Sequence, residues 1–167
     1  MKVFHAILFF TVLVAIAGCE TRSSKAGVYN DRIMHHQYEI SEGFSVLDSA
    51  LNTYDSAEIV VARAVLNARI TTGLRLLDTL NGFSGDTTLS MAARSLFSFY
   101  HKVANDEYTE LSMILQKPDS IYTVEDQMRA WALDSIIRVR FKDSHDAFLT
   151  EQQTFWGKYN IVEKTDE

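Results

Sequence analysis

The sequence has few of the residues that crosslink a chain or break a helix. Among its 167 residues there are one cysteine, one proline and seven glycines. The single cysteine, Cys19, excludes a disulfide within the chain and any zinc or iron–sulfur site built from several thiolates. Stretches in which polar and apolar residues alternate are also scarce, so the composition favours α-helices over strands.

Basic residues are outnumbered: 16 Lys and Arg stand against 22 Asp and Glu, which gives a net charge of −6. An acidic domain lacks the positive surface with which proteins bind nucleic acid, and anionic lipid headgroups repel it. We therefore expect no nucleic-acid partner, and we expect any membrane attachment to depend on something other than a basic face.

Recurrent catalytic and metal-binding motifs are missing as well. The sequence contains no Glu-x-x-His, His-Glu-x-x-His, His-x-x-x-His or Cys-x-x-Cys-His, which excludes the usual di-iron, zinc and haem-attachment patterns. The segment 82–85 falls short of a Gly-x-Ser-x-Gly elbow. The sequence thus predicts no catalytic residues, no metal ligands, no cofactor and no enzymatic activity.

The most informative segment that is present lies at the start of the chain. Lys2 is followed by an almost unbroken apolar run over 3–17, which suits a signal peptide and is short for a transmembrane helix. The run closes with Ile16-Ala17-Gly18-Cys19, which resembles the lipobox of bacterial lipoproteins. The resemblance implies cleavage after Gly18 and acylation of Cys19, including a palmitate-type chain.

Several acyl chains would give stable anchoring that one chain does not. The alternative is an ordinary secretory signal, which would leave Cys19 as a lone free thiol. Removal of residues 1–18 takes away one charge, that of Lys2, and changes the net charge from −6 to −7. Glu20 after the cysteine resembles the sorting signal of lipoproteins sent to the outer membrane, so we expect an outer-membrane location.

Beyond the anchor, apolar residues recur at alternating spacings of three and four, the pattern of helices with one buried face. The pattern predicts helices over 28–54, 57–81, 87–117 and 123–159. Similar lengths and short connections predict an all-α, antiparallel up-down-up-down four-helix bundle, preceded by a signal-peptide helix. The predicted organisation is a signal peptide 1–18, a lipidated tether 19–28, the bundle 29–160 and a charged tail 161–167.

The mature chain resembles a family of small bacterial surface lipoproteins through scattered segments, which are Tyr29-Asn30-Asp31, Gly85-Asp86 to Phe99-Tyr100, Glu107-Tyr108 and Phe155 to Ile161. That family has a lipobox, a four-helix ectodomain and no assigned activity. Trp156 and Gly157 depart from its usual small or charged residues. The resemblance implies the fold and has no functional residues to transfer.

Several side chains could carry chemistry. His36 and Glu39 share a helix face next to His35, and either solvated polar residues or a metal site would explain them. His145 falls on an apolar stripe, which predicts a buried histidine with a hydrogen-bond partner. Its candidate partners are Gln37, Gln152 and Tyr100, and the alternative is an axial haem ligand opposite Met34 or Met128. Glu107 and Glu110 could form an acid–base pair, but an exposed helical face explains them better.

Two aromatic residues are tentative partner-surface residues: Phe83 in a predicted loop and Trp156 near the end of the last helix. Both could instead close the ends of the bundle. The sequence therefore predicts a lipid-anchored envelope protein that acts as a non-catalytic binding or structural module for an unknown protein or ligand. The alternative function is a helical bundle that binds haem or a metal.

Overall fold

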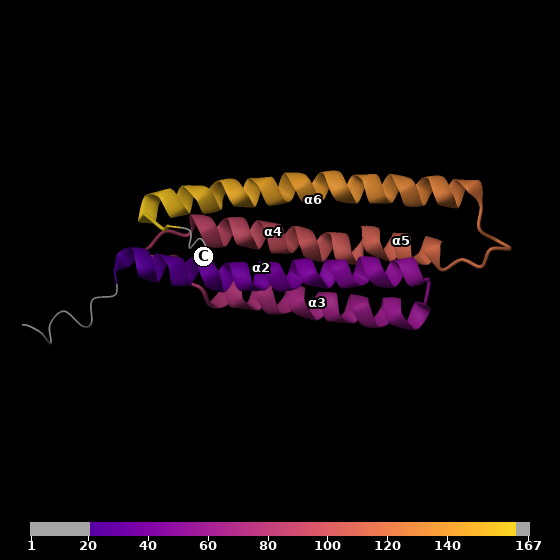
Figure 1. Ribbon diagram of the computed structural model, residues 1–167, viewed down its shortest axis with the longest axis horizontal. Coiled ribbons are helices and arrows are strands. Elements are labelled where there is room, and N and C mark those ends of the chain that lie inside the picture. Colours follow the sequence, from indigo (N-terminus) through magenta and orange to yellow (C-terminus); the bar gives the residue numbers. More distant parts are fainter. Residues whose placement is uncertain (1–20, 163–167) are drawn as a thin grey trace, which may run out of the picture.

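The computed structural model describes residues 21–162, and these residues are almost entirely helical. Figure 1 shows the helices lying side by side along one long axis, with α4 and α5 following one another in a single row. The elements are α2 (Arg22–Thr53), α3 (Ser56–Thr79), α4 (Thr88–Asn105), α5 (Glu107–Leu115) and α6 (Val124–Tyr159). No helix within 21–162 is long and apolar enough to cross a membrane. The predicted signal peptide, Cys19 and most of the charged tail lie outside the described residues.

The first helix begins earlier than the sequence indicated. Residues 22–28, predicted to belong to the tether, form the first turns of α2. Thr21 caps this helix by accepting a 3.1 Å hydrogen bond from the Ser24 backbone N–H, and Ala26 is fully buried. The tether prediction was wrong here because capping and burial stabilise a segment with too few apolar residues to show a helical period.

The turn between α2 and α3 lies where the sequence placed it. Tyr54 ends α2 in the left-handed conformation, and Asp55 caps α3 by accepting hydrogen bonds from the N–H groups of Ala57 and Glu58, at 2.7 and 3.2 Å. The Glu58 carboxylate does not complete a capping box; it accepts a 2.9 Å bond from the Thr53 hydroxyl. One aspartate is thus enough to start α3.

The loop between α3 and α4 is also as predicted. Ser84 and Gly85 both have positive φ, 52° and 85°, and the Asp86 N–H donates to the Phe83 carbonyl at 3.0 Å. Two consecutive positive φ angles make a tight reversal of the chain direction. At the other end of the molecule, Thr123 and Asp126 form a capping box at the start of α6.

The predicted third helix, 87–117, is interrupted. The chain leaves helical geometry at Asp106, with φ −99° and ψ −79°, and α5 starts anew at Glu107. Next to the break, the Asn105 side chain donates a 2.8 Å hydrogen bond to the His101 carbonyl. Asn and Asp compete with helical hydrogen bonds in this way, so the apolar period alone did not reveal the break.

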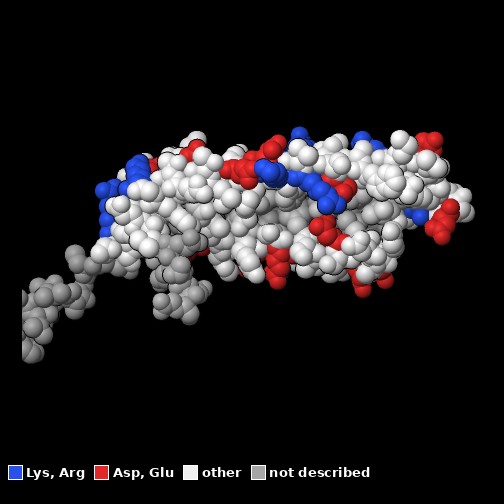
Figure 2. Space-filling model, turned by 45° about the horizontal axis from the view of Figure 1, so that its top comes forward, with Lys and Arg blue, Asp and Glu red and all other residues white. Residues whose placement is uncertain are grey.

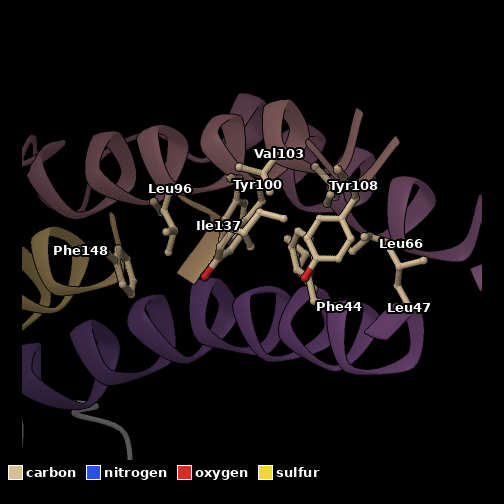
Figure 3. Packing of buried hydrophobic residues seen from close by; sticks show 14 of the residues in the cluster. Phe44, Leu47, Leu66, Leu96, Tyr100, Val103, Tyr108, Ile137 and Phe148 are labelled. Atoms are coloured by element: carbon tan, nitrogen blue, oxygen red, sulfur yellow. The ribbon is translucent and has the colours of Figure 1, made fainter. Parts of the chain in front are cut away.

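The core contains the apolar stripes predicted for each helix. Its middle is aromatic: Phe44 lies 5.4 Å from the Tyr100 and Tyr108 rings and 4.8 Å from Phe141. Figure 3 shows Tyr100 and Tyr108 extending toward α2 from the opposite row of helices. Aromatic pairs at these distances contribute about 0.5–1.5 kcal/mol beyond the burial of their area.

Candidate functional site

Phe83 lies in an aromatic cluster at the end of the bundle where α2 begins. Its ring is 4.8 Å from Tyr159, 5.7 Å from Tyr29 and 5.9 Å from Phe155. These rings come from α2, from the loop before α4 and from α6. Phe83 is half-buried and packs against the core, so its position is that of a residue that closes the bundle end.

Trp156 belongs to the same end of α6. It is half-buried against the core, and its Nε1 is enclosed without a hydrogen-bond partner among the described residues. The structure therefore does not bring the two tentative partner residues together on one exposed surface.

The polar group in the middle of α2 consists of side chains that are close neighbours on one helix. Glu39 oxygens lie 3.5 Å from His35 Nε2 and 3.3 Å from His36 Nδ1. All three residues come from one helix. Within residues 21–162, no group of three or more His, Cys, Asp or Glu side chains is arranged to hold a metal ion.

His145 is half-buried rather than part of the core. One of its three candidate partners is bonded elsewhere, because the Gln152 side-chain amide donates to Asn30 Oδ1 at 2.9 Å. The prediction that His145 is a buried, hydrogen-bonded histidine was wrong. Its neighbours on the stripe, Phe141 and Phe148, supply the packing. Of the two suggested haem partners, Met128 is exposed and Met34 is half-buried.

The two glutamates of α5 form ion pairs with α6. Glu110 accepts two hydrogen bonds from Arg129, at 2.6 and 2.8 Å, and Glu107 pairs with Arg140. The hydrogen bonds from Arg129 hold the pKa of Glu110 below its usual value. Both carboxylates therefore connect helices, and neither is placed as half of an acid–base pair.

The best-formed site is a groove at the other end of the bundle, between α2, α5 and α6. We call it the distal groove; its volume is about 610 Å³, within the range of small-molecule sites. Its floor is apolar, and aromatic and charged side chains surround the opening. The aromatic and charged side chains that line it are Asp48, Tyr54, Tyr108, Tyr122, Trp131, Asp134 and Arg138.

Asp48 is an exposed residue of α2 whose carboxylate lines the distal groove. The Tyr108 hydroxyl donates a 2.9 Å hydrogen bond to Asp48 Oδ1. Partial loss of hydration raises the pKa of the Asp48 carboxyl, and the charge of Asp134 adds to this, while the Tyr108 hydrogen bond and Arg138 offset part of the rise. Burial and the nearby Asp48 charge likewise raise the pKa of Tyr108. The one guanidinium at hand, that of Arg138, is bonded to Asp134 at 2.7 and 2.9 Å.

Aromatic side chains flank this carboxylate. Trp131 is 65% exposed and Tyr54 is 63% exposed, although both line the groove. Tyr54 also has a φ of 58°, the left-handed conformation in which helices commonly end. The arrangement can accept a ligand against flat rings while presenting one carboxylate without an ion-pair partner.

The sequence patterns did not predict the distal groove. Trp131, Asp134 and Arg138 recur at spacings of three and four on α6, which could have signalled a second, polar face beside the apolar stripe. Asp48 lies more than eighty residues away on α2. No local pattern connects the two segments, so only helix packing reveals the groove.

A second depression, of about 520 Å³, lies between α2 and α3 and is almost wholly apolar; the larger side chains around it are Val46, Val61 and Val65. Ser49, Thr53 and Glu58 also line it, but the Thr53 hydroxyl is bonded to the Glu58 carboxylate and the Ser49 hydroxyl to the Ser45 carbonyl. Nothing within residues 21–162 covers it. Its lining gives fewer grounds for a specific ligand than that of the distal groove.

Comparison with known proteins gives no match: the chain fits no protein family, and neither a curated protein nor a solved structure is significantly similar to it. Any functional interpretation therefore rests on the geometry and chemistry described above.

Proposed function

We propose that this chain is a lipid-anchored protein of the bacterial cell envelope whose bundle, arranged up-down-up-down, is a non-catalytic binding module. Cys19 is the lipidated residue, the outer membrane is the location, and a small molecule bound in the distal groove is the ligand. The observation that carries the binding function is the distal groove itself, a cavity of about 610 Å³ with aromatic side chains at its opening.

Two properties of the groove favour binding over a purely structural role. Asp48 has no ion-pair partner among residues 21–162, and Trp131 leaves most of its surface in solvent. Both side chains are therefore available to a ligand. Exposed aromatic rings and carboxylates with a shifted pKa are concentrated at binding sites.

The distribution of charge supports an orientation with the groove away from the membrane. Figure 2 shows basic side chains gathered at the end of the bundle where α2 begins, mixed acidic and basic side chains along the middle of the face, and acidic side chains at the opposite tip. Arg22 and Lys158 both belong to the first end, at a shallow depression of the surface. With Cys19 only three residues before Arg22, the anchor leaves this basic end next to the headgroups.

The anchor is tested by replacing the proposed lipidation site. We expect Cys19→Ala to abolish incorporation of a labelled fatty acid and to move the protein from the membrane fraction to the soluble fraction. Ser23→Ala, close by on α2, is the matched control and should keep both properties. Membrane association of the Cys19→Ala protein would contradict acyl anchoring.

Binding is tested by a thermal-shift screen of small molecules on the soluble domain. A ligand of the distal groove should raise the unfolding temperature of the wild type but not of Trp131→Ala, because the ring at the opening is lost. Tyr38→Ala removes another exposed aromatic ring, 70% exposed on α2, and should leave the shift intact. Ligands that shift all three proteins equally would place binding elsewhere.

A further inference from the structure

The chemistry of the distal groove indicates which ligands it selects; this inference rests on the proposed binding function. We infer that the distal groove binds small organic cations, such as amines or quaternary ammonium compounds with an apolar body. The charge of the groove, its surface and its lack of a metal-binding arrangement all favour this class of ligand.

The charged side chains of the distal groove favour a cation. Asp48 and Asp134 face each other across the groove, while Arg138 is the one cationic side chain that lines it. Because Arg138 is bonded to Asp134, the Asp48 carboxylate is left with a neutral donor, the Tyr108 hydroxyl. A ligand cation beside Asp48 would relieve its repulsion with Asp134, and an anion would add to it.

The surface around the Asp48 carboxylate is aromatic and apolar. Tyr54, Tyr122 and Trp131 line the same groove, and the faces of aromatic rings attract cations, most strongly that of Trp. The apolar floor, which includes Leu111 and Ile137, would contact the uncharged part of the ligand. Charge and surface therefore favour the same class of molecule.

The side chains of the groove suit an organic cation better than a metal ion. Divalent metals require several oxygen, nitrogen or sulfur ligands around one point. Within residues 21–162 no group of three or more suitable side chains is arranged in that way, and aromatic rings would supply no such ligands. The groove offers one carboxylate and several rings, which suits an ammonium group.

The test uses three probes with the same ring and different charges: phenyltrimethylammonium, benzyl alcohol and benzoate. Binding is measured by calorimetry and by the fluorescence of Trp131, with Trp131→Phe to assign the signal. We expect the cation to bind at least about tenfold more tightly than the alcohol, with benzoate the weakest. Asp48→Asn should remove most of this preference, and Asp143→Asn should keep it, since Asp143 is exposed on α6 outside the groove.

The pH dependence gives a second readout. The probe cation has a fixed charge, so its affinity should rise as the pH rises through the elevated pKa of Asp48. The charged and titratable groups that face Asp48 are Tyr108 from α5 and Asp134 and Arg138 from α6. Because Asn does not ionise, the rise should disappear in Asp48→Asn.

The outcomes distinguish this inference from the function on which it rests. If benzyl alcohol or benzoate binds in the groove as tightly as the cation, or if Asp48→Asn retains the preference, the cation selectivity is refuted while the binding function stands. If none of the probes binds at millimolar concentration and the screen yields no groove ligand, both fall. Tighter binding of the cation that depends on Asp48 supports both.

Discussion

Asp48 shows how a single residue can oppose the stability of the fold that contains it. The folded state raises the pKa of its carboxyl above the ordinary aspartate value of 3.8, mainly through loss of hydration. An acid whose pKa is higher in the folded state binds protons more tightly there than in the unfolded chain. Its contribution to stability is therefore greatest at low pH and is lost as the pH rises above about 4 and through the folded pKa.

The first prediction follows from this fall in stability with rising pH. Asp48→Asn should be at least as stable as the wild type at pH 7, because the amide oxygen can still accept the Tyr108 hydrogen bond without carrying charge. Urea unfolding between about pH 4 and pH 7 should show a smaller fall in stability with pH for the variant. A clear loss of stability at pH 7 would mean that the carboxylate is favourable in the folded protein.

The second prediction concerns the buried pair of Asn30 and Gln152. Their side chains join α2 to α6 through a 2.9 Å hydrogen bond inside the core. Gln152→Leu leaves the Asn30 carbonyl oxygen without its donor and should lower the free energy of unfolding by about 1–3 kcal/mol. Gln153→Leu, at the exposed neighbouring position, should change it by less than about 0.5 kcal/mol.

A double variant, Asn30→Leu with Gln152→Leu, completes this comparison. Because neither polar partner remains to be left unsatisfied, it should recover part of the loss. Chemical denaturation of the four proteins measures the coupling, and strictly additive losses would show that the hydrogen bond contributes little.

At the scale of the helices, glycine positions decide how closely two elements approach. A Cβ added at Gly73 of α3 would lie 3.0 Å from the Phe97 ring of α4 and 3.2 Å from Ile40 Cδ1 of α2. Phe97 and Ile40 are fully buried, so neither can move aside freely. Gly157 of α6, by contrast, is exposed, and an added Cβ there meets nothing within 4 Å.

The third prediction compares these two glycines. Gly73→Ala should lower stability by about 1–3 kcal/mol, because the core has to shift to accept the methyl group. Gly157→Ala should raise stability by roughly 0.5–1 kcal/mol, because alanine loses less backbone entropy in a helix. Thermal unfolding of both variants checks this, and equal shifts for the two would contradict the packing at Gly73.

The helices also show where sequence patterns succeed and where they do not. The capping box of Thr123 and Asp126 and the cap at Asp55 were predictable, because a cap depends on residues within one turn. The early start of α2 and the break at Asp106 were not predictable, because they depend on side chains that pack or form hydrogen bonds in the folded protein. Neither feature changes the spacing of the apolar residues, so the apolar period does not reveal it.

At the scale of the whole molecule, the cluster around Phe83 closes the end of the bundle where α2 begins. It joins α2, the loop before α4 and α6 through rings 4.8–5.9 Å from Phe83. The Tyr159 hydroxyl reinforces the contact through hydrogen bonds of 3.4 Å to the Phe83 carbonyl and 3.3 Å to Asp86 Oδ2. The cluster therefore links segments that are far apart in the chain.

The fourth prediction is that Phe83 acts through stability. Phe83→Ala should lower the free energy of unfolding by roughly 2 kcal/mol, less than a fully buried phenylalanine would, because the ring is half-buried. Met113→Ala, 66% exposed on α5, is a control that should stay within about 0.5 kcal/mol. Weakened ligand binding by Phe83→Ala with unchanged stability would instead support the partner-surface role.

The sequence by itself determined the helical class, most helix boundaries and the inward-facing stripes, because these depend on residues within a few turns of one another. It also carries the whole case for the lipid anchor, since Cys19 lies outside the described structure and its acylation stays a prediction. Tertiary structure decided which polar groups meet: it moved His145 out of the core, paired Asn30 with Gln152, and placed Asp48 opposite Asp134. Which of these side chains meet depends on how the helices pack, and helical periodicity indicates the buried face of each helix without fixing which residues of two helices come into contact.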